Sequence, residues 1–115
     1  MVNLVKIAVG ISSVEELSLR QTEFLKKIND RKFPYFYHTT RMMPQKRESI
    51  ISSGSLYWVI KGVICARQKI VEITKQEDTD GVKRCRIYLD ESIIKTTPIR
   101  KRPFQGWRYL KKQKI

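Results

Sequence analysis

The feature that most constrains the fold is a β-type stretch from Ser55 to Thr74, interrupted only at Gly62. The strand-forming segment SLYWVIK precedes the glycine and a longer apolar run follows it, which predicts two strands joined by a tight turn. In the second strand, apolar residues occupy both alternating phases. One side can stay buried along its whole length only if a bulge near Arg67–Lys69 switches the phase. We therefore expect a strongly bent sheet.

The remaining segments add more strands and few helices. Ser13 and Glu16 form a capping box before a helix that runs to Asn29-Asp30, with apolar residues at helical spacing. Asp80-Gly81 is a strong hairpin signal. Further expected elements are strands at 2–9, 35–40, 82–89 and 104–110, and a short helix at 45–53.

Clustered strands with few helices are typical of the α+β class. The predicted fold is a bent, mostly antiparallel sheet or a small β-barrel, with one long N-terminal helix and one short helix. A chain of 115 residues has the length of a single domain, here residues 1–115, in which 111–115 form a frayed basic tail.

Net charge is the main deviation in composition. The chain holds 24 Lys and Arg against 11 Asp and Glu, which gives +13. From Lys95 to the end there are 8 basic residues and no acidic one, interleaved with Phe104, Trp107 and Tyr109. Cations that contact phosphates beside aromatic rings that stack on bases are typical of nucleic-acid binding.

The leading hypothesis is a small basic protein that binds nucleic acid, with RNA preferred over DNA, through an aromatic and basic sheet face. Tyr57 or Trp58, with Trp107, would supply stacking. Arginines and lysines would supply phosphate contacts. The candidate residues are Arg41, Lys46, Arg47, Tyr57, Trp58, Lys61, Arg67, Arg100, Lys101, Arg102, Trp107, Arg108, Lys111 and Lys112.

Two other classes of function stay open. The same face could dock on an acidic protein or on a ribonucleoprotein. Alternatively, an enzyme or sensor could bind a nucleotide or modified base in a pocket near His38 and Gln68. No catalytic motif is present, so the enzyme class is the less favoured one.

The sequence also bounds the compartment and the cofactors. Cys65 and Cys85, in a chain without a secretory signal pattern, favour free thiols and a cytoplasmic location. One His and two distant Cys form no recognisable metal-ligand set, and we predict neither metal nor cofactor. No apolar run is long enough to span a membrane. The oligomeric state is left open.

Three segments together resemble a known family. They are HTTRMMP at 38–44, GSLYWVIKG at 54–62 and RPFQGWRYL at 102–110. They resemble a short, uncharacterised bacterial family known only as a domain of unknown function, over about Asn3 to Leu110. That resemblance implies no activity and no catalytic residue. The order of elements is also similar to PUA-like domains and their ASCH relatives, bent-sheet barrels of which many bind RNA or modified bases.

Overall fold

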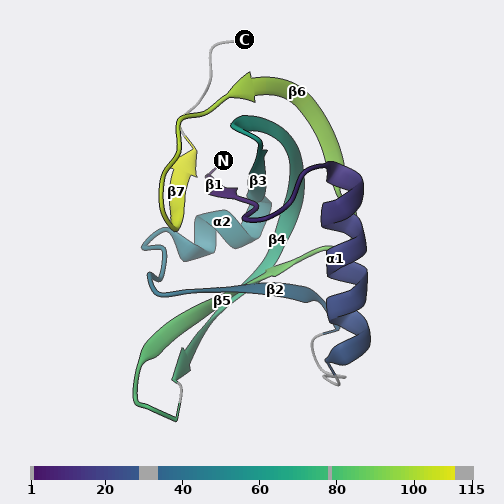
Figure 1. Ribbon diagram of the computed structural model, residues 1–115. Helices are drawn as coiled ribbons and strands as arrows, with labels where there is room; N and C mark the ends of the chain where they lie inside the picture. Colours follow the sequence, from purple (N-terminus) through teal and green to yellow (C-terminus); the bar gives the residue numbers. More distant parts are fainter. Residues whose placement is uncertain (1, 29–33, 78, 111–115) are drawn as a thin grey trace.

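The computed structural model describes residues 2–28, 34–77 and 79–110 (Figure 1). This part of the chain forms two helices and seven strands. In chain order they are β1 (Asn3–Ile7), α1 (Val14–Lys27), β2 (Phe36–Thr40), α2 (Arg47–Ser53), β3 (Ser55–Ile60), β4 (Val63–Glu77), β5 (Lys83–Leu89), β6 (Ile94–Arg100) and β7 (Trp107–Leu110).

The prediction of an α+β chain with two helices and a largely antiparallel sheet agrees with this arrangement. The prediction of a long N-terminal helix is wrong. Helix α1 has 14 residues, close to the average for globular proteins. Ser13 caps its start by accepting a hydrogen bond from the Glu16 amide, as the capping box predicts. The chain leaves the helix at Ile28, which has extended backbone angles.

The strands form one open, mixed sheet in the order β2-β5-β4-β3-β1-β7, and β6 pairs with β4 as well. Strands β1 and β3 run parallel, and the other described pairs are antiparallel. We call the group β7-β1-β3-β6, with residues 63–69 of β4, sheet A. Sheet B is β2 and β5 with residues 70–77 of β4.

Strand β4 belongs to both sheets and bends between them (Figure 1). The pairing register shifts twice along it. Cys65 is the extra residue against β3, and Val71 is the extra residue against β5. Against β6 the extra residues belong to β6, because a single residue of β4 lies opposite 96–98. The predicted bulge exists, but not at Arg67–Lys69, because the two phase changes flank this segment instead of falling within it. The bulges raise the local twist and let one strand serve two sheets.

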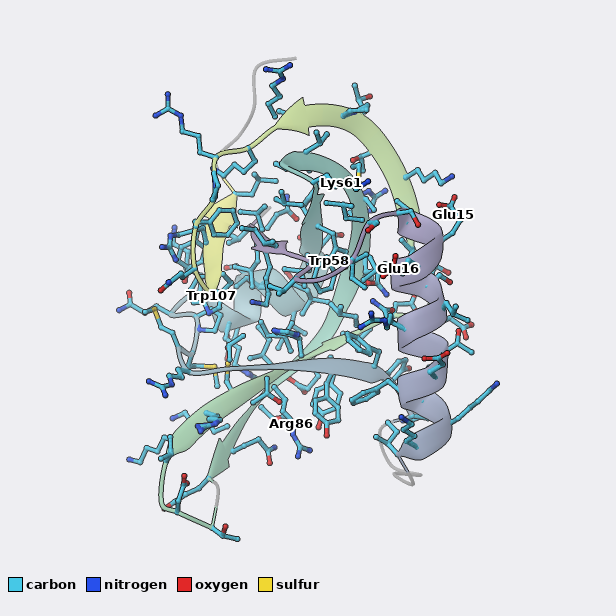
Figure 2. All side chains as sticks on the ribbon, in the orientation of Figure 1. Glu15, Glu16, Trp58, Lys61, Arg86 and Trp107 are labelled. Carbon is cyan, nitrogen blue, oxygen red and sulfur yellow. The ribbon has the colours of Figure 1, made fainter. Side chains whose placement is uncertain are left out.

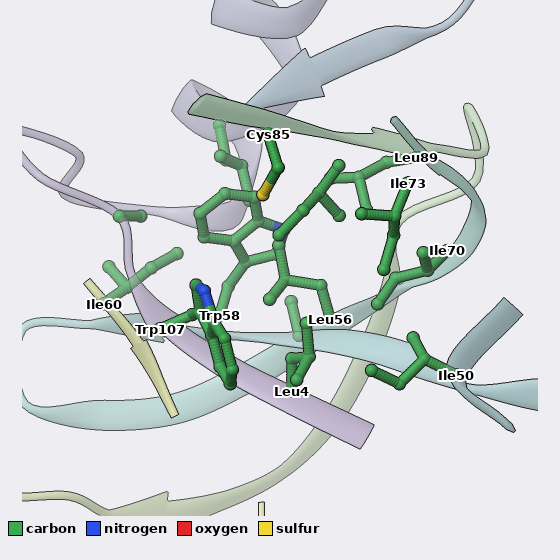
Figure 3. Packing of buried hydrophobic residues seen from close by; sticks show 14 residues of the cluster. Leu4, Ile50, Leu56, Trp58, Ile60, Ile70, Ile73, Cys85, Leu89 and Trp107 are labelled. Carbon is green, nitrogen blue, oxygen red and sulfur yellow. The ribbon is translucent and has the colours of Figure 1, made fainter. Parts of the chain in front are cut away.

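The main core lies between the two sheets (Figure 3). Leu4, Leu56 and Trp58 contribute from sheet A, and Ile87 and Leu89 from sheet B. We call the faces that enclose this core the inner faces. Helix α2 adds Ile50, which is fully buried in the same cluster.

A second, smaller cluster lies on the outer face of sheet A. Val5, Val59 and Ile64 are almost fully buried there, although they point away from the main core. The chain between β6 and β7 covers them, and Phe104 packs against them. Sheet A therefore has apolar residues on both faces.

No helix among the described residues is long and apolar enough to cross a membrane.

Candidate nucleic-acid interface

The strand pairing brings a row of predicted residues onto the outer face of sheet A. Val5 pairs with Arg108 on one side and with Tyr57 on the other, and Tyr57 pairs with Arg67. Directly paired residues share a face. Because Val5 is in the outer cluster, all four side chains lie on the outer face. Lys69, two residues after Arg67, follows on the same face and is exposed.

Phe104 extends this row with a second aromatic ring. Two cations flank it, with Lys101 Nζ at 5.8 Å and Arg108 Cζ at 5.6 Å from the ring centroid. The Arg108 guanidinium also donates to the carbonyl oxygens of Gln105 at 2.6 Å and Trp107 at 3.0 Å. These bonds hold the guanidinium beside the ring. Tyr57 and Phe104 are both half-buried in the outer cluster, so each ring is partly open to solvent.

Sheet A carries no acidic residue. The segments 3–7, 55–60, 63–69 and 94–110 contain neither Asp nor Glu. One cation of these segments, Lys95, is neutralised from outside by Glu15 on α1, at 2.9 Å. The remaining cations produce a field of one sign over this sheet, which attracts polyanions.

The two tryptophans occupy a different place from the one predicted. Trp58 is 2% exposed and Trp107 is 7% exposed, and both belong to the main core (Figures 2 and 3). Trp107 Nε1 donates to the Met42 carbonyl at 2.8 Å. Neither indole offers a free face, so stacking on Trp107 is contradicted, and of the predicted alternatives Tyr57 or Trp58 only Tyr57 remains open. Even positions of β3 face the main core, which leaves Tyr57 on the outer side.

The loop before α2 packs against β7. Lys46 donates its backbone N–H to the Tyr109 hydroxyl at 3.3 Å, and Lys46 Nζ lies 5.5 Å from the Tyr109 ring centroid. The ring of Tyr109 also contacts Trp107 edge-on. Arg41, exposed, directly precedes Met42 in the same loop. Arg41 and Lys46 therefore lie near the β7 edge of sheet A, away from the row of Tyr57.

Arg47 has a structural role, because it connects α2 to β4. Its guanidinium bonds to the Glu72 carboxylate, and its Nε donates to the Ile73 carbonyl at 2.7 Å. This contact fixes α2 to the edge of β4 in sheet B. Because Glu72 neutralises the charge, Arg47 adds little to a polyanion surface.

Gln68 is fully buried and its amide is saturated. Its oxygen accepts from Gln21 Nε2 and Trp58 Nε1, both at 2.8 Å. Its nitrogen donates to Gln21 Oε1 at 2.7 Å and to the Asp90 carbonyl at 2.8 Å. This network joins α1 to both sheets. The amide has no capacity left for a ligand.

His38 lies on the inner face of sheet B, opposite sheet A. It pairs with Ile87 in the sheet, and its ring meets Trp58 edge-on at 6.3 Å. Burial, and then the positive charge of Lys6, lower the pKa of His38 to about 4. The imidazole is therefore neutral at pH 7.

The other predicted cations are spread around sheet A. Lys61 occupies the β3–β4 turn with a positive φ of 52°. Arg100 ends β6, and Arg102 is exposed in the segment that covers the outer cluster. Lys111 and Lys112 lie outside the described residues, as does the predicted tail 111–115.

None of the candidate residues lines the cavity beside α1. It measures about 660 Å³ and lies between α1, the start of β2 and the segment after β5. Asp90 and Glu91 line it, and its described lining contains no Lys or Arg. Such a cavity does not suit a polyanion. No group of three or more His, Cys, Asp or Glu that could hold a metal ion lies together within the described ranges.

Three residues were absent from the predicted candidate set: Lys69, Phe104 and Lys6. The sequence could have indicated Lys69, which has the same strand phase as Arg67, and Phe104, which lies in the acid-free stretch. Lys6 could also have been found from its strand phase. It occupies the same alternating phase as Leu4 and Ala8, which are buried core residues, and it is itself 9% exposed.

Comparison with known proteins places the chain in a family. Residues 4–115 match the model of a family described as a protein of unknown function (DUF1489). The chain belongs to this family. The match confirms the resemblance predicted from the three sequence segments, and it carries no activity with it. No curated protein and no solved structure matches the chain.

Proposed function

We propose that this DUF1489 protein binds single-stranded RNA on the outer face of sheet A. One observation carries the proposal. Tyr57 and Phe104, both partly open, lie among Arg67, Lys69 and Arg108 on a sheet without a carboxylate. Single-stranded nucleic acid is bound by this combination, in which bases stack on rings and cations contact the backbone.

A single strand suits the face better than a duplex. Bases of RNA are available for stacking only where they are unpaired, and sheet faces that bind RNA use aromatic side chains in this way. The rings here lie in a sheet and not on a protruding helix that could enter a groove. The hydroxyl of Tyr57 can in addition bond to a base or a ribose.

The test is fluorescence anisotropy with a labelled single-stranded RNA, a duplex RNA and a duplex DNA over a range of salt. If 4–6 phosphates are contacted, log K falls with log salt with a slope of about −3 to −4. We expect the single strand to bind best and to resist competition by heparin. Equal, weak binding of all three that heparin removes would overturn the proposal.

The matched variants are Tyr57→Ala, which removes a ring, and Arg67→Gln, which removes a charge. Lys83→Gln on sheet B is the control, because Lys83 is exposed and outside the proposed face. Loss of one stacked base should weaken binding by about 1–3 kcal/mol. If Lys83→Gln weakens binding as much as Arg67→Gln, the attraction is generic and the face is not a site.

A protein partner is the second candidate. An acidic peptide could dock on the same apolar and cationic surface, where Ile94 is 44% exposed beside Arg67. This alternative predicts that free RNA binds only weakly and that Tyr57→Ala disturbs a protein complex more than Arg67→Gln does. A pull-down with each variant distinguishes the two candidates.

We also propose a cytoplasmic location and a fold similar to PUA-like domains. The bend of β4 between two sheets supports the similarity of fold, since those domains are bent-sheet barrels. An experimental structure that superposes on a PUA-like barrel over sheets A and B would bear it out. A sheet order with no equivalent in those domains would refute it.

A further inference from the structure

Lys6 is an unusual residue of the main core. It lies on β1 between Leu4 and Ala8 and is 9% exposed. Trp58 and Trp107 are its direct neighbours on the two adjacent strands, so an indole flanks it on each side of the inner face (Figure 3 shows both indoles). A lysine at such a position is costly, because apolar surroundings disfavour an ammonium ion.

No partner compensates for this burial. Within the described chain, the side chain of Lys6 has no hydrogen bond and no ion pair. Its Nζ is not among the fully buried atoms that lack a partner, so the tip of the side chain keeps contact with solvent. Burial alone lowers the pKa of Lys6, and no carboxylate acts against this effect.

A second base faces it from sheet B. Burial lowers the pKa of His38 most, and the positive charge of Lys6 lowers it further. Its ring is held edge-on against Trp58. In the described chain the imidazole makes no hydrogen bond. Lys6 and His38 are therefore both neighbours of Trp58, one on each sheet, and no acidic group of the described chain contributes to the pKa shift of either.

We propose that Lys6 and His38, between Trp58 and Trp107, form a binding site for a small oxyanion, the phosphate or carboxylate group of a small molecule. An oxyanion supplies the acceptor that the ammonium lacks, and a charge-assisted hydrogen bond is among the stronger ones. It also favours a proton on either base. The positive field of sheet A raises the local concentration of anions at the site.

This site is separate from the proposed RNA face. Lys6 lies on the inner face of sheet A, whereas Tyr57 and Arg67 lie on the outer face. The two proposals can therefore fail independently. A substitution on one face should leave binding at the other face unchanged, so each proposal can be tested by itself.

The experiment follows the ¹³Cε and ¹⁵Nζ signals of Lys6 and the ring signals of His38 by NMR in the full chain. Inorganic phosphate and acetate are the two probes, titrated separately. We expect saturable shifts at both residues with at least one probe, and the better probe identifies the chemical class. The exposed Lys83 reports non-specific attraction. Shifts at Lys6 that do not saturate, or that match those of Lys83, would overturn the proposal.

Lys6→Met is the deciding variant. Methionine is apolar, unbranched and similar in length, so the core keeps its packing. Loss of the charged hydrogen bond should weaken anion binding, followed at His38, by at least about tenfold. Lys83→Met is the matched control and should not change it. Unchanged binding in Lys6→Met would assign the anion to another place and refute the proposal.

Discussion

Sheets A and B share one strand, yet they differ in what they bury and what they expose. Sheet A has apolar residues on both faces and no carboxylate. Sheet B lines the main core with its inner face, Tyr88 is 4% exposed on its outer face, and its described segments hold Glu72 and Glu77 beside their cations. The outer side of sheet B carries Tyr37, with Arg86 at 4.2 Å from its ring centroid.

The difference indicates a division of labour. A sheet buried on one face is enough to make a core with a partner sheet. The outer cluster of sheet A adds an apolar patch bordered by Arg and Lys side chains. The main core does not need this patch in order to form. We infer that sheet B mainly supports the fold, whereas the outer face of sheet A carries the function.

The largest expected effect is at the junction of the sheets. Gln68→Ala leaves the Gln21 amide, the Trp58 N–H and the Asp90 carbonyl without their partner. Unpaired buried polar groups and the cavity should together lower the free energy of unfolding by about 4 kcal/mol. Chemical denaturation measures this loss. Gln76→Ala, near the end of β4, is the control, and an equal loss there would contradict the role of the junction.

The pH dependence of stability tests the burial of His38 on the inner face of sheet B. The pKa of His38 is about 4 in the folded chain and 6.5 ordinarily. Between these two pH values the imidazole is protonated in the unfolded chain and neutral in the folded chain. Stability is fully present above pH 6.5 and falls as the pH drops towards 4, by about 3 kcal/mol. Denaturation at several pH values should show this slope, and His38→Asn should remove it. A slope that persists in the variant would contradict the assignment.

The outer cluster should be the next most sensitive feature. Val59→Ala removes two methyl groups from a buried place on the outer face of sheet A and should cost about 2 kcal/mol. Thr39→Ala, at an exposed position of β2 in sheet B, should cost less than about 0.5 kcal/mol. Thermal unfolding compares the two. Equal effects would break the distinction between the outer faces.

The charge difference should appear in RNA affinity. Replacing Arg67, Lys69 and Arg108 together by Gln removes up to three phosphate contacts and should reduce the salt slope by about 2 units. The comparison substitution in sheet B, which removes two charges, replaces Lys75 and Lys83 by Gln and should leave the slope nearly unchanged. Anisotropy over a salt series measures both. A larger change in the sheet B variant would reverse the proposed division.

The smallest expected effect is a gain in stability. Lys6→Met replaces a buried amine without a partner by an apolar side chain, and it should raise the free energy of unfolding by about 1 kcal/mol at pH 7. Urea denaturation measures it. A position whose native residue lowers stability is typical of a functional site. If Lys6→Met instead destabilises the protein, the lysine has a structural partner and the argument for a site weakens.

Much of the fold follows from local signals. The capping box, the Asp80-Gly81 turn and the tight β3–β4 connection all act between neighbouring residues, and each is observed. The positions of the bulges were not predictable in this way. They depend on which residues of β3, β5 and β6 pair with β4, and that information is non-local.

The candidate site was predictable in composition but not in orientation. The acid-free run predicted the basic character of β6, β7 and the segment between them. Adjacent residues on a strand point to opposite faces, and the sequence does not tell which of Tyr57 and Trp58 faces the core. The position of Trp107 was not predictable for a different reason: its contact with Met42 joins segments 65 positions apart.

The most direct test of the central claim is an NMR titration of the labelled protein with a short single-stranded RNA, mapped residue by residue. We predict that the shifted signals concentrate on the outer face of sheet A, around Tyr57, Arg67, Lys69, Phe104 and Arg108, and that sheet B stays unchanged. Shifts centred on sheet B, or spread evenly over every exposed cation, would contradict it.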